Sequence, residues 1–250
     1  MNCIKNMVYG SQDPESQVLD LYLPEEECSD LLIYFHGGGL EAGDKEVPTV
    51  IRLTEYGKAV ISANYRMYPK AVYPQFIEDA AAVVQWAREH IGSYKPVKNI
   101  FVSGSSAGAY LTAMLAFAPD YLGQYGIKTT DITGYIIDSA QTTTHFNVLR
   151  ERGLDTKRIV VDEAAPVYHI HENTVFPNIM VLVSDNDMPC RLEQNLMFLK
   201  TLEMFGCPAE KVTYRLMGGF RHCEYVRTDG YPGLLNDYIE KIKSEEKHYD

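Results

Sequence analysis

The sequence predicts an α/β fold with a mostly parallel central sheet and helices on both of its faces. Short apolar runs alternate with amphipathic helical patterns along the chain, and this alternation is typical of such folds. Two of the apolar runs end in glycine-rich turns. Because ligands of these sheets gather beyond the carboxyl ends of the strands, we expect the functional residues at that edge.

Length and composition fit one domain. The chain has 250 residues, of which 46% are hydrophobic and 23% are charged, as is usual for a globular protein with a full core. No internal repeat, low-complexity tract or linker divides the sequence. We therefore expect a single α/β domain over residues 1–250.

The predicted elements follow one another in a regular order. Seven runs read as strands, at residues 18–23, 31–35, 59–64, 100–103, 134–137, 179–183 and 212–216. The first alternates like an exposed strand, whereas 31–35 is apolar throughout like a buried one. Helical patterns cover residues 73–91, 109–118, 191–205 and 234–243. These elements account for most of the chain.

The segment 139–174 interrupts this order. It is polar and mixed in character, and it connects two predicted strands. Long connections in compact domains are commonly functional, so a small lid is one interpretation. An ordinary surface excursion with one helix is the other. In either case the segment is too short for a separate cap domain.

The charge and the cysteine content of the chain indicate which binding partners and which cellular compartment to expect. The net charge is −11, and no cluster of lysines and arginines is present, so we expect no nucleic acid and no anionic membrane surface as a partner. No apolar run reaches the length of a membrane span, and the N-terminus lacks the pattern of a secretory signal. Five irregularly spaced cysteines indicate free thiols in a reducing compartment. These features favour a cytoplasmic protein.

The predicted strand 100–103 leads into a G-x-S-x-G turn, residues 104–108, and then into a helix of small residues. A serine hydroxyl is a weak nucleophile, and chemistry requires it on a tight bend beside a base and facing backbone N–H donors. Gly104 and Gly108 leave room for strand and helix to cross, because neither has a Cβ atom. The pentapeptide also arises by chance, so alone it identifies Ser106 only weakly.

A second glycine motif lies upstream, where the predicted strand 31–35 ends in His36-Gly37-Gly38-Gly39. Consecutive glycines let backbone N–H groups turn toward a developing negative charge, and one such donor lowers an acyl-transfer barrier by about 3–4 kcal/mol. The alternative is a glycine-rich turn without a function. The two motifs are about 70 residues apart and stand in the order that acyl-transfer chemistry on this kind of sheet needs.

Chain order narrows the choice of base, because the nucleophile of such sheets is followed by an acid and then by a histidine. Five of the seven histidines precede the predicted acid strand, and His248 lies in the charged C-terminal tail. His222 remains, in a glycine-containing loop after the strand 212–216. A surface histidine in a flexible loop is the alternative interpretation.

The acid is expected just after the strand 179–183, where Asp185 and Asp187 compete. We prefer Asp187, because it has left the strand and can reach back toward the histidine, whereas Asp185 fits a turn or a cap. A buried carboxylate beside His222 would fix its tautomer and stabilise the imidazolium that forms. His222 is therefore predicted to act as general base and then as general acid.

With these motifs in place, the sequence resembles the α/β-hydrolases, specifically esterases with an HGGG loop. These include hormone-sensitive-lipase-like carboxylesterases and small acetyl and feruloyl esterases. The resemblance extends to Gly43-Asp44-Lys45 and to the stretch from 64–69 into the helix that carries Asp79. The residues it assigns are the nucleophile Ser106, the acid Asp187, the base His222, and the oxyanion donors Gly38, Gly39 and Ala107. This chemistry needs neither a metal nor an organic cofactor.

The chain departs from the family pattern at three places, one of which is the acid loop, where Gly-x-x-Asp has become Ser184-Asp185-Asn186-Asp187. Ser105 stands where hormone-sensitive-lipase-like members commonly have an acidic residue, and this favours the compact acetyl or feruloyl type, as does the missing N-terminal cap. Leu40 stands where small esterases often have tryptophan, so the shape of the pocket stays open.

The resemblance implies a serine carboxylesterase that hydrolyses small acyl esters through an acyl-serine intermediate, with acetylated or hydroxycinnamoylated sugars as candidate substrates. One alternative is an amide hydrolase, such as a kynurenine-formamidase-like enzyme or a peptidase on the same scaffold. Another is a non-catalytic ligand-binding protein, although such proteins tend to lose the histidine that is present here as His222. The sequence gives no oligomeric state.

Two further pairs of residues have two interpretations each. Cys190 and Cys223 flank the proposed acid and base, either as redox-sensitive thiols or as small buried packing residues. The pair His169 and His171 could face a metal from one strand face. A third ligand in a recognisable pattern is missing, so we expect no metal site.

Overall fold

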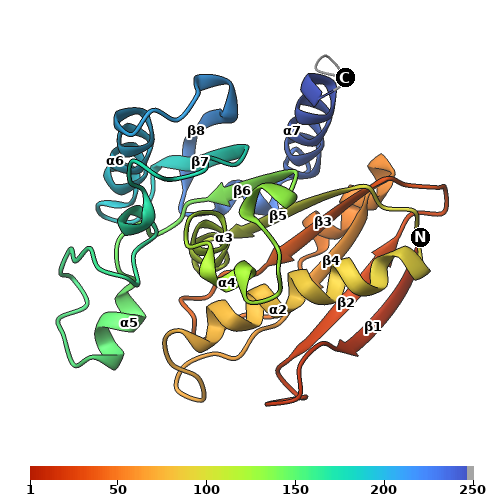
Figure 1. Cartoon of the computed structure of the whole chain (residues 1–250), viewed down its shortest axis with the longest axis horizontal. Coiled ribbons are helices and arrows are strands. Elements are labelled where there is room, and N and C mark those ends of the chain that lie inside the picture. The colour runs from red at the N-terminus through yellow and green to blue at the C-terminus, as the bar shows by residue number, and fades with distance from the viewer. Residues whose placement is uncertain (247–250) are drawn as a thin grey trace.

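In the part of the chain that the computed structural model describes, residues 1–246, eight strands form one sheet in the order β1-β2-β4-β3-β5-β6-β7-β8 (Figure 1). β2 is antiparallel to both of its neighbours, and all the other neighbouring pairs are parallel. The predicted α/β class with a mostly parallel sheet is confirmed. His248 lies outside the described residues.

Each predicted strand is present, although the last one continues to Arg221, through residues that were expected to form a loop. The strands are β1 Asn2–Val8, β2 Val18–Leu23, β3 Asp30–Phe35, β4 Ala59–Ala63, β5 Asn99–Ser105, β6 Gly134–Asp138, β7 Ile179–Asn186 and β8 Val212–Arg221. β1 was not predicted from the sequence. It is a mostly exposed edge strand that pairs only with β2, so polar residues such as Lys5 and Asn6 are tolerated and no apolar pattern marks it.

Helices cover both faces of the sheet, as predicted (Figure 1). The longer ones are α2 Gln75–His90, α3 Ala107–Phe117, α6 Arg191–Met204 and α7 Tyr231–Glu246. The shorter ones are α1 Pro48–Ile51, α4 Asp120–Gly123 and α5 Phe146–Glu151, with 3₁₀ turns η1 Arg52–Tyr56, η2 Ile91–Ser93, η3 Thr129–Asp131, η4 Pro166–His169, η5 Ala209–Lys211 and η6 Glu224–Arg227. The core of one face contains α2, α3 and α6. On the opposite face, α7 packs with α1 and η1.

The prediction that residues 18–23 form an exposed strand is wrong, because β2 is buried along its whole length. Leu19 and Leu21 belong to the apolar core. The polar residue between them, Asp20, is also covered, and its carboxylate lies 3.3 Å from the Lys45 ammonium and accepts a hydrogen bond from Tyr22 at 3.1 Å. Asp20 is polar because it pairs with Lys45 inside the protein. Its place between two leucines therefore imitates the alternation of a strand with one side in solvent.

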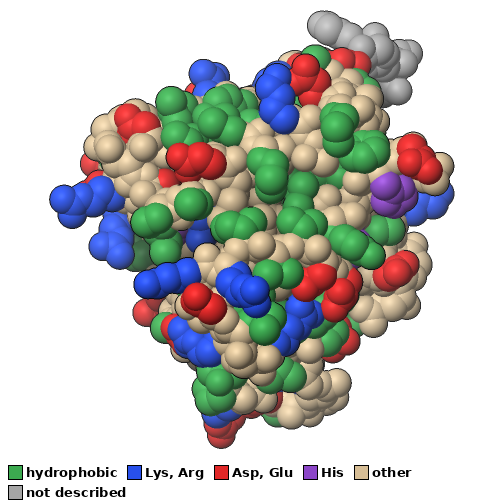
Figure 2. All heavy atoms as spheres, turned by 90° about the vertical axis from the view of Figure 1, so that its left-hand side faces the viewer, with side chains coloured by type: hydrophobic (Ala, Val, Ile, Leu, Met, Phe, Trp, Pro, Cys, Tyr) green, Lys and Arg blue, Asp and Glu red, His purple; other side chains and the backbone are tan. Residues whose placement is uncertain are grey.

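The parallel strands end at one edge of the sheet and so bring distant residues together. The HGGG loop follows β3, Ser106 follows β5, Asp187 follows β7 and His222 follows β8. No helix within residues 1–246 is long and apolar enough to cross a membrane. On the face drawn in Figure 2, positive and negative side chains are interspersed, without a continuous basic region.

Candidate active site

Ser106 stands on a strained turn between β5 and α3. Its backbone has φ 56° and ψ −111°, a conformation that costs a non-glycine residue about 1–3 kcal/mol. The neighbouring glycines allow a close crossing. A Cβ on Gly104 would lie 2.4 Å from the carbonyl carbon of Gly108, and one on Gly108 would lie 1.9 Å from the Phe35 carbonyl oxygen. The turn thus projects the serine side chain out of the sheet edge.

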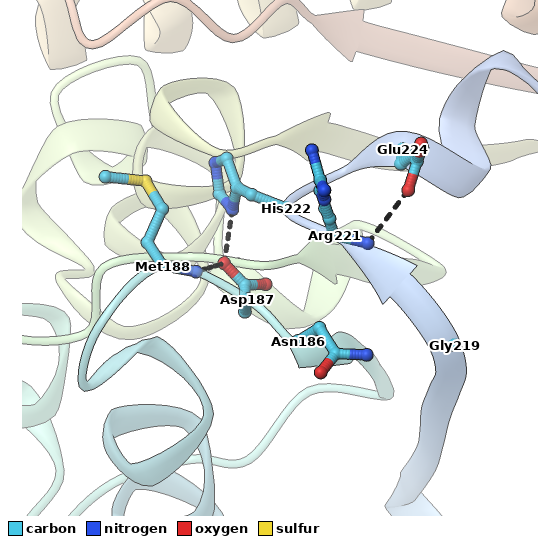
Figure 3. A pocket seen from close by; sticks show the side chains of 7 residues that line it. All are labelled: Asn186, Asp187, Met188, Gly219, Arg221, His222 and Glu224. Carbon is cyan, nitrogen blue, oxygen red and sulfur yellow. Dashed lines mark hydrogen bonds and ion pairs between the residues drawn. The ribbon is translucent and has the colours of Figure 1, made fainter.

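The structure brings Ser106, His222 and Asp187 into one line of contacts. Nε2 of His222 lies 2.8 Å from Oγ of Ser106, and Nδ1 lies 2.5 Å from Oδ1 of Asp187. Figure 3 shows the imidazole and the carboxylate facing each other from the ends of β8 and β7. In this arrangement Nδ1 is the donor and Nε2 is free to accept the serine proton.

Asp187 is held by three donors in a site where its side chain is 1% exposed. Besides His222, the Ser139 hydroxyl donates to Oδ2 at 2.8 Å and the Met188 N–H donates to Oδ1 at 2.6 Å. Burial raises the pKa of Asp187, but the hydrogen bond and charge of His222 and the hydrogen bonds from Ser139 and Met188 outweigh it and lower that pKa. The carboxylate therefore stays ionised beside the imidazole.

Asp185, the competing aspartate, has a different role. Its carboxylate accepts the Gly219 N–H at 2.8 Å and so ties the end of β7 to the irregular part of β8. No hydrogen bond joins it to His222 among the described residues.

The glycine loop after β3 packs directly against the serine. A Cβ on Gly37 would lie 3.3 Å from the Ser106 Cβ. Gly38 and Gly39 have φ values of +115° and +66°, and a Cβ on Gly38 would lie 1.9 Å from the Ala42 carbonyl oxygen, so the loop requires glycine there. Within residues 1–246, the N–H groups of Gly38, Gly39 and Ala107 form no hydrogen bond with another residue.

His36, at the start of this loop, supports the backbone. Its ring stacks on Tyr65 with centroids 4.6 Å apart, and the Tyr65 hydroxyl donates to the His36 carbonyl oxygen at 2.9 Å. Burial lowers the pKa of His36, so the ring is neutral. Tyr65 is a supporting residue that sequence reasoning missed, since nothing local links it to the loop.

The segment 139–174 contacts the same loop through α5. Asn147 donates a hydrogen bond to the Gly39 carbonyl oxygen at 2.9 Å, and a Cβ on Gly39 would lie 2.9 Å from Cζ of Phe146. Arg150 forms an ion pair with Glu41 just beyond the loop. Sequence analysis missed Asn147, because only the folded chain places it beside a residue 108 positions away.

A cleft of about 980 Å³ opens above the serine. Its lining includes Gly38, Ser106, Phe146, Met188, His222 and Val226. Charged side chains occupy other parts of the wall, namely Asp44, Glu46, Arg221, Glu224 and Arg227. A second hollow of about 550 Å³, drawn in Figure 3, shares Met188, Arg221, His222 and Glu224 with it. The site thus offers both apolar and polar walls to a ligand.

The two cysteines near the site differ. Cys190 is exposed, so its interpretation as a buried packing residue is wrong; it precedes α6 in a left-handed conformation on the surface. Cys223 is half-buried, lines the cleft and has its sulfur 3.7 Å from Nε2 of His222.

The imidazole of His169 bonds to the Glu163 carbonyl oxygen at 2.9 Å. In residues 1–246 no group of three or more potential ligands is suited to a metal ion.

Known proteins match this sequence and this fold. The profile of the BD-FAE family matches residues 19–148. Esterase LipI of Mycobacterium tuberculosis is 35% identical over 99 residues, which are 37% of this chain and 30% of the relative. An acetyl esterase of Salmonella schwarzengrund is 37% identical over 97 residues, 36% of this chain and 29% of the relative. The chain thus spans less than a third of the length of these curated relatives.

Solved structures share the fold over nearly the whole chain. A truncated carbohydrate esterase from gut microbiota superimposes with a TM-score of 0.78 at 20% identity, covering 97% of each chain. The resemblance to α/β-hydrolase esterases that the motifs indicate is thereby confirmed. Since the matched region contains both glycine motifs and more than half of the sequence, the chain belongs to the BD-FAE family.

Proposed function

We propose that the protein is a serine carboxylesterase that hydrolyses small acyl esters through an acyl-Ser106 intermediate. The observation that carries this proposal is the 2.8 Å contact between Ser106 Oγ and His222 Nε2, with the glycine loop against the same serine. Membership of the BD-FAE family supports it, and so do the names of the relatives, which are esterases.

The proposed reaction uses only groups of the chain. His222 takes the proton of the Ser106 hydroxyl as the oxygen attacks the ester carbonyl carbon, while Asp187 stabilises the imidazolium. The negative charge that forms on the carbonyl oxygen is accepted by the N–H groups of Gly38, Gly39 and Ala107. His222 then gives its proton to the leaving alcohol. Water repeats the sequence on the acyl-serine and releases the acid.

For the substrate class we propose esters of polar alcohols, with acetylated or hydroxycinnamoylated sugars as candidates. The mixed wall of the cleft supports this, because the apolar side chains Phe146 and Met188 suit an acyl group and the charged rim suits hydroxyl groups. A structural neighbour described as a carbohydrate esterase points the same way. We propose no nucleic acid or membrane as a partner, and a cytoplasmic location fits the free thiols.

We propose further that the segment 139–174 forms a small lid beside the cleft. Phe146 forms part of the cleft wall, and Asn147 holds the oxyanion loop from outside. In this role the segment shapes the pocket and keeps the N–H donors aimed at the serine.

Ser106→Ala tests the proposal, with Ser103→Ala as a matched control. Ser103 lies in the same strand, is fully buried, and its hydroxyl has no partner among the described residues. We expect loss of turnover of a short-chain nitrophenyl ester in Ser106→Ala and full turnover in the control, with both variants folded. Unchanged turnover in Ser106→Ala would remove the proposal.

A panel of acetyl, butyryl, octanoyl and feruloyl esters, run beside formyl-amide and peptide substrates, defines the specificity. Faster cleavage of an amide than of any ester would replace the esterase proposal by an amidase. Tight retention of a ligand without hydrolysis would instead indicate a binding protein.

A further inference from the structure

A second buried carboxylate lies directly behind the proposed triad. Asp138 ends β6, is fully buried, and accepts the Ser106 N–H at its backbone carbonyl at 2.8 Å. Its side chain accepts hydrogen bonds from Tyr225, from Ser105 at 2.8 Å and from Tyr231 at 3.0 Å. None of the described lysines and arginines forms an ion pair with it. Burying a carboxylate without a cation costs folding free energy. A role in the site would explain why Asp138 stands here.

Asp138 is connected to Asp187 by two hydroxyl groups. The Tyr225 hydroxyl that bonds Asp138 lies 3.2 Å from Oγ of Ser139, and Ser139 donates to Oδ2 of Asp187 at 2.8 Å. Ser139 is firmly held, because its N–H donates to Leu182 and its carbonyl oxygen accepts from the buried Arg191. A continuous line therefore runs from Asp138 to the residue that orients His222.

When Asp138 is ionised, the three contacts that connect it to Asp187 share only two hydroxyl hydrogens. The single proton of Tyr225 then goes to Asp138 and that of Ser139 goes to Asp187, so the contact between the two hydroxyl oxygens has no hydrogen. A proton on Asp138 completes the line. Asp138 then donates to Tyr225, Tyr225 donates to Ser139, and Ser139 donates to Asp187.

Burial raises the pKa of Asp138 to about 6, although hydrogen bonds from Tyr225, Ser105 and Tyr231 and the charge of His222 oppose the rise. The other titratable groups that face it are Tyr34, Tyr225, Tyr231 and Cys223, and burial raises the pKa of each, so they remain neutral. Protonation of Asp138 is therefore accessible in weakly acidic solution.

We propose that Asp138 is a positioning residue for Asp187, acting through Tyr225 and Ser139. This chain of hydrogen bonds holds Oδ2 of Asp187 in place, so that Oδ1 stays directed at His222. This inference rests on the proposed function, because its consequence is a properly oriented base for Ser106. Sequence reasoning missed it, since Tyr225 is 87 residues from Asp138 and no motif links them.

Tyr225→Phe tests the proposal against Tyr231→Phe as a matched control. Both tyrosines are buried and both donate to Asp138, but only Tyr225 contacts Ser139. For Tyr225→Phe we expect kcat to fall about tenfold, as for one lost hydrogen bond in a site, with an altered acidic limb of the pH–rate profile. Tyr231→Phe leaves the contact between Tyr225 and Ser139 in place, so its kcat should stay within about twofold. Equal effects of the two variants on kcat and on the profile would overturn the proposal.

Asp138→Asn gives a second comparison. The amide N–H₂ takes the place of the protonated carboxyl and donates to Tyr225, while its oxygen accepts from Ser105 and Tyr231, so this variant should retain most of kcat. Asp138→Leu breaks all three contacts and should lose at least as much kcat as Tyr225→Phe. An Asp138→Asn enzyme that is folded but as slow as Asp138→Leu would contradict the proposal.

A spectroscopic readout separates this proposal from the esterase proposal. The ¹H NMR signal of the proton between His222 and Asp187 needs no substrate. We expect it to shift in Tyr225→Phe and to stay in place in Tyr231→Phe. The esterase proposal fails if the wild type has no turnover that depends on Ser106, whereas the positioning proposal fails if both variants leave this signal unchanged.

Discussion

Asn147 in α5 donates its side-chain N–H to the Gly39 carbonyl oxygen at 2.9 Å and so connects the segment 139–174 to the glycine loop after β3. The Gly39 carbonyl belongs to the same planar peptide unit as the Leu40 N–H, so a hydrogen bond to this carbonyl fixes the orientation of that unit. We expect this to restrict the backbone of Gly39 and with it the direction of the Gly39 N–H.

Removing this tie should slow the chemical step. For Asn147→Ala we expect kcat on a nitrophenyl acetate to fall about three- to tenfold, with a small change in KM, as for a lost hydrogen bond that orients a transition-state donor. Asn173→Ala, an exposed change in the same segment, is the control. Equal kcat values for the two variants would show that α5 does not hold the loop.

The crossing of β5 and α3 should tolerate no side chain at Gly108. A Cβ there would lie 1.9 Å from the Phe35 carbonyl oxygen, so Gly108→Ala should lower the free energy of unfolding by about 2–4 kcal/mol. The control is Gly123→Ala in α4, where a Cβ meets nothing within 4 Å. Urea unfolding of both variants measures the difference. Similar midpoints would contradict the close crossing.

The two aspartates after β7 should differ sharply in effect. Asp187→Asn removes the charge beside His222 and should lower kcat by about 10³–10⁴-fold through the wrong tautomer of the imidazole. Asp185→Asn keeps an oxygen for the Gly219 N–H, so its kcat should stay within about twofold. Steady-state rates on one ester decide between them. A larger loss in Asp185→Asn would reverse the assignment of the acid.

Acid stability should depend on Asp30. Burial raises the pKa of this carboxyl, but hydrogen bonds from Lys243, Lys58 and Asn99 lower it to about 2. The folded-state pKa lies below the unfolded value of about 3.9. The ionised carboxylate therefore adds to the free energy of unfolding above about pH 4, and this contribution is lost as the pH falls toward 2.

Asp30→Asn measures this contribution. The variant should be less stable than the wild type by about 2 kcal/mol at pH 7, and the gap should narrow as the pH falls from about 4 to about 2. Urea midpoints at a series of pH values give the comparison. A gap that is constant over this range would show that the ionised form of Asp30 is not the stabilising one.

Much of the fold is predictable because its signals are local. Apolar runs such as 31–35 and 179–183 correspond to β3 and β7, and the two glycine motifs mark the loops that follow β3 and β5. The order of acid and base along the chain then leaves few candidates, and the folded chain brings His222 to Ser106.

Long-range contacts account for what the sequence did not reveal. β2 alternates like an exposed strand only because Asp20 is neutralised by Lys45, a residue far along the chain. The contacts of Asn147 with Gly39 and of Tyr225 with Asp138 join loops and helices that no periodicity relates. β1 lacks an apolar pattern because an edge strand needs none.

Covalent labelling of the nucleophile tests the central claim most directly. A phosphonate ester should add one equivalent to the wild type, with the mass found on the peptide that contains Ser106 and activity lost in proportion, and His222→Ala should label far more slowly. Undiminished ester turnover in protein fully labelled at Ser106, or labelling confined to another residue as activity disappears, would contradict the account.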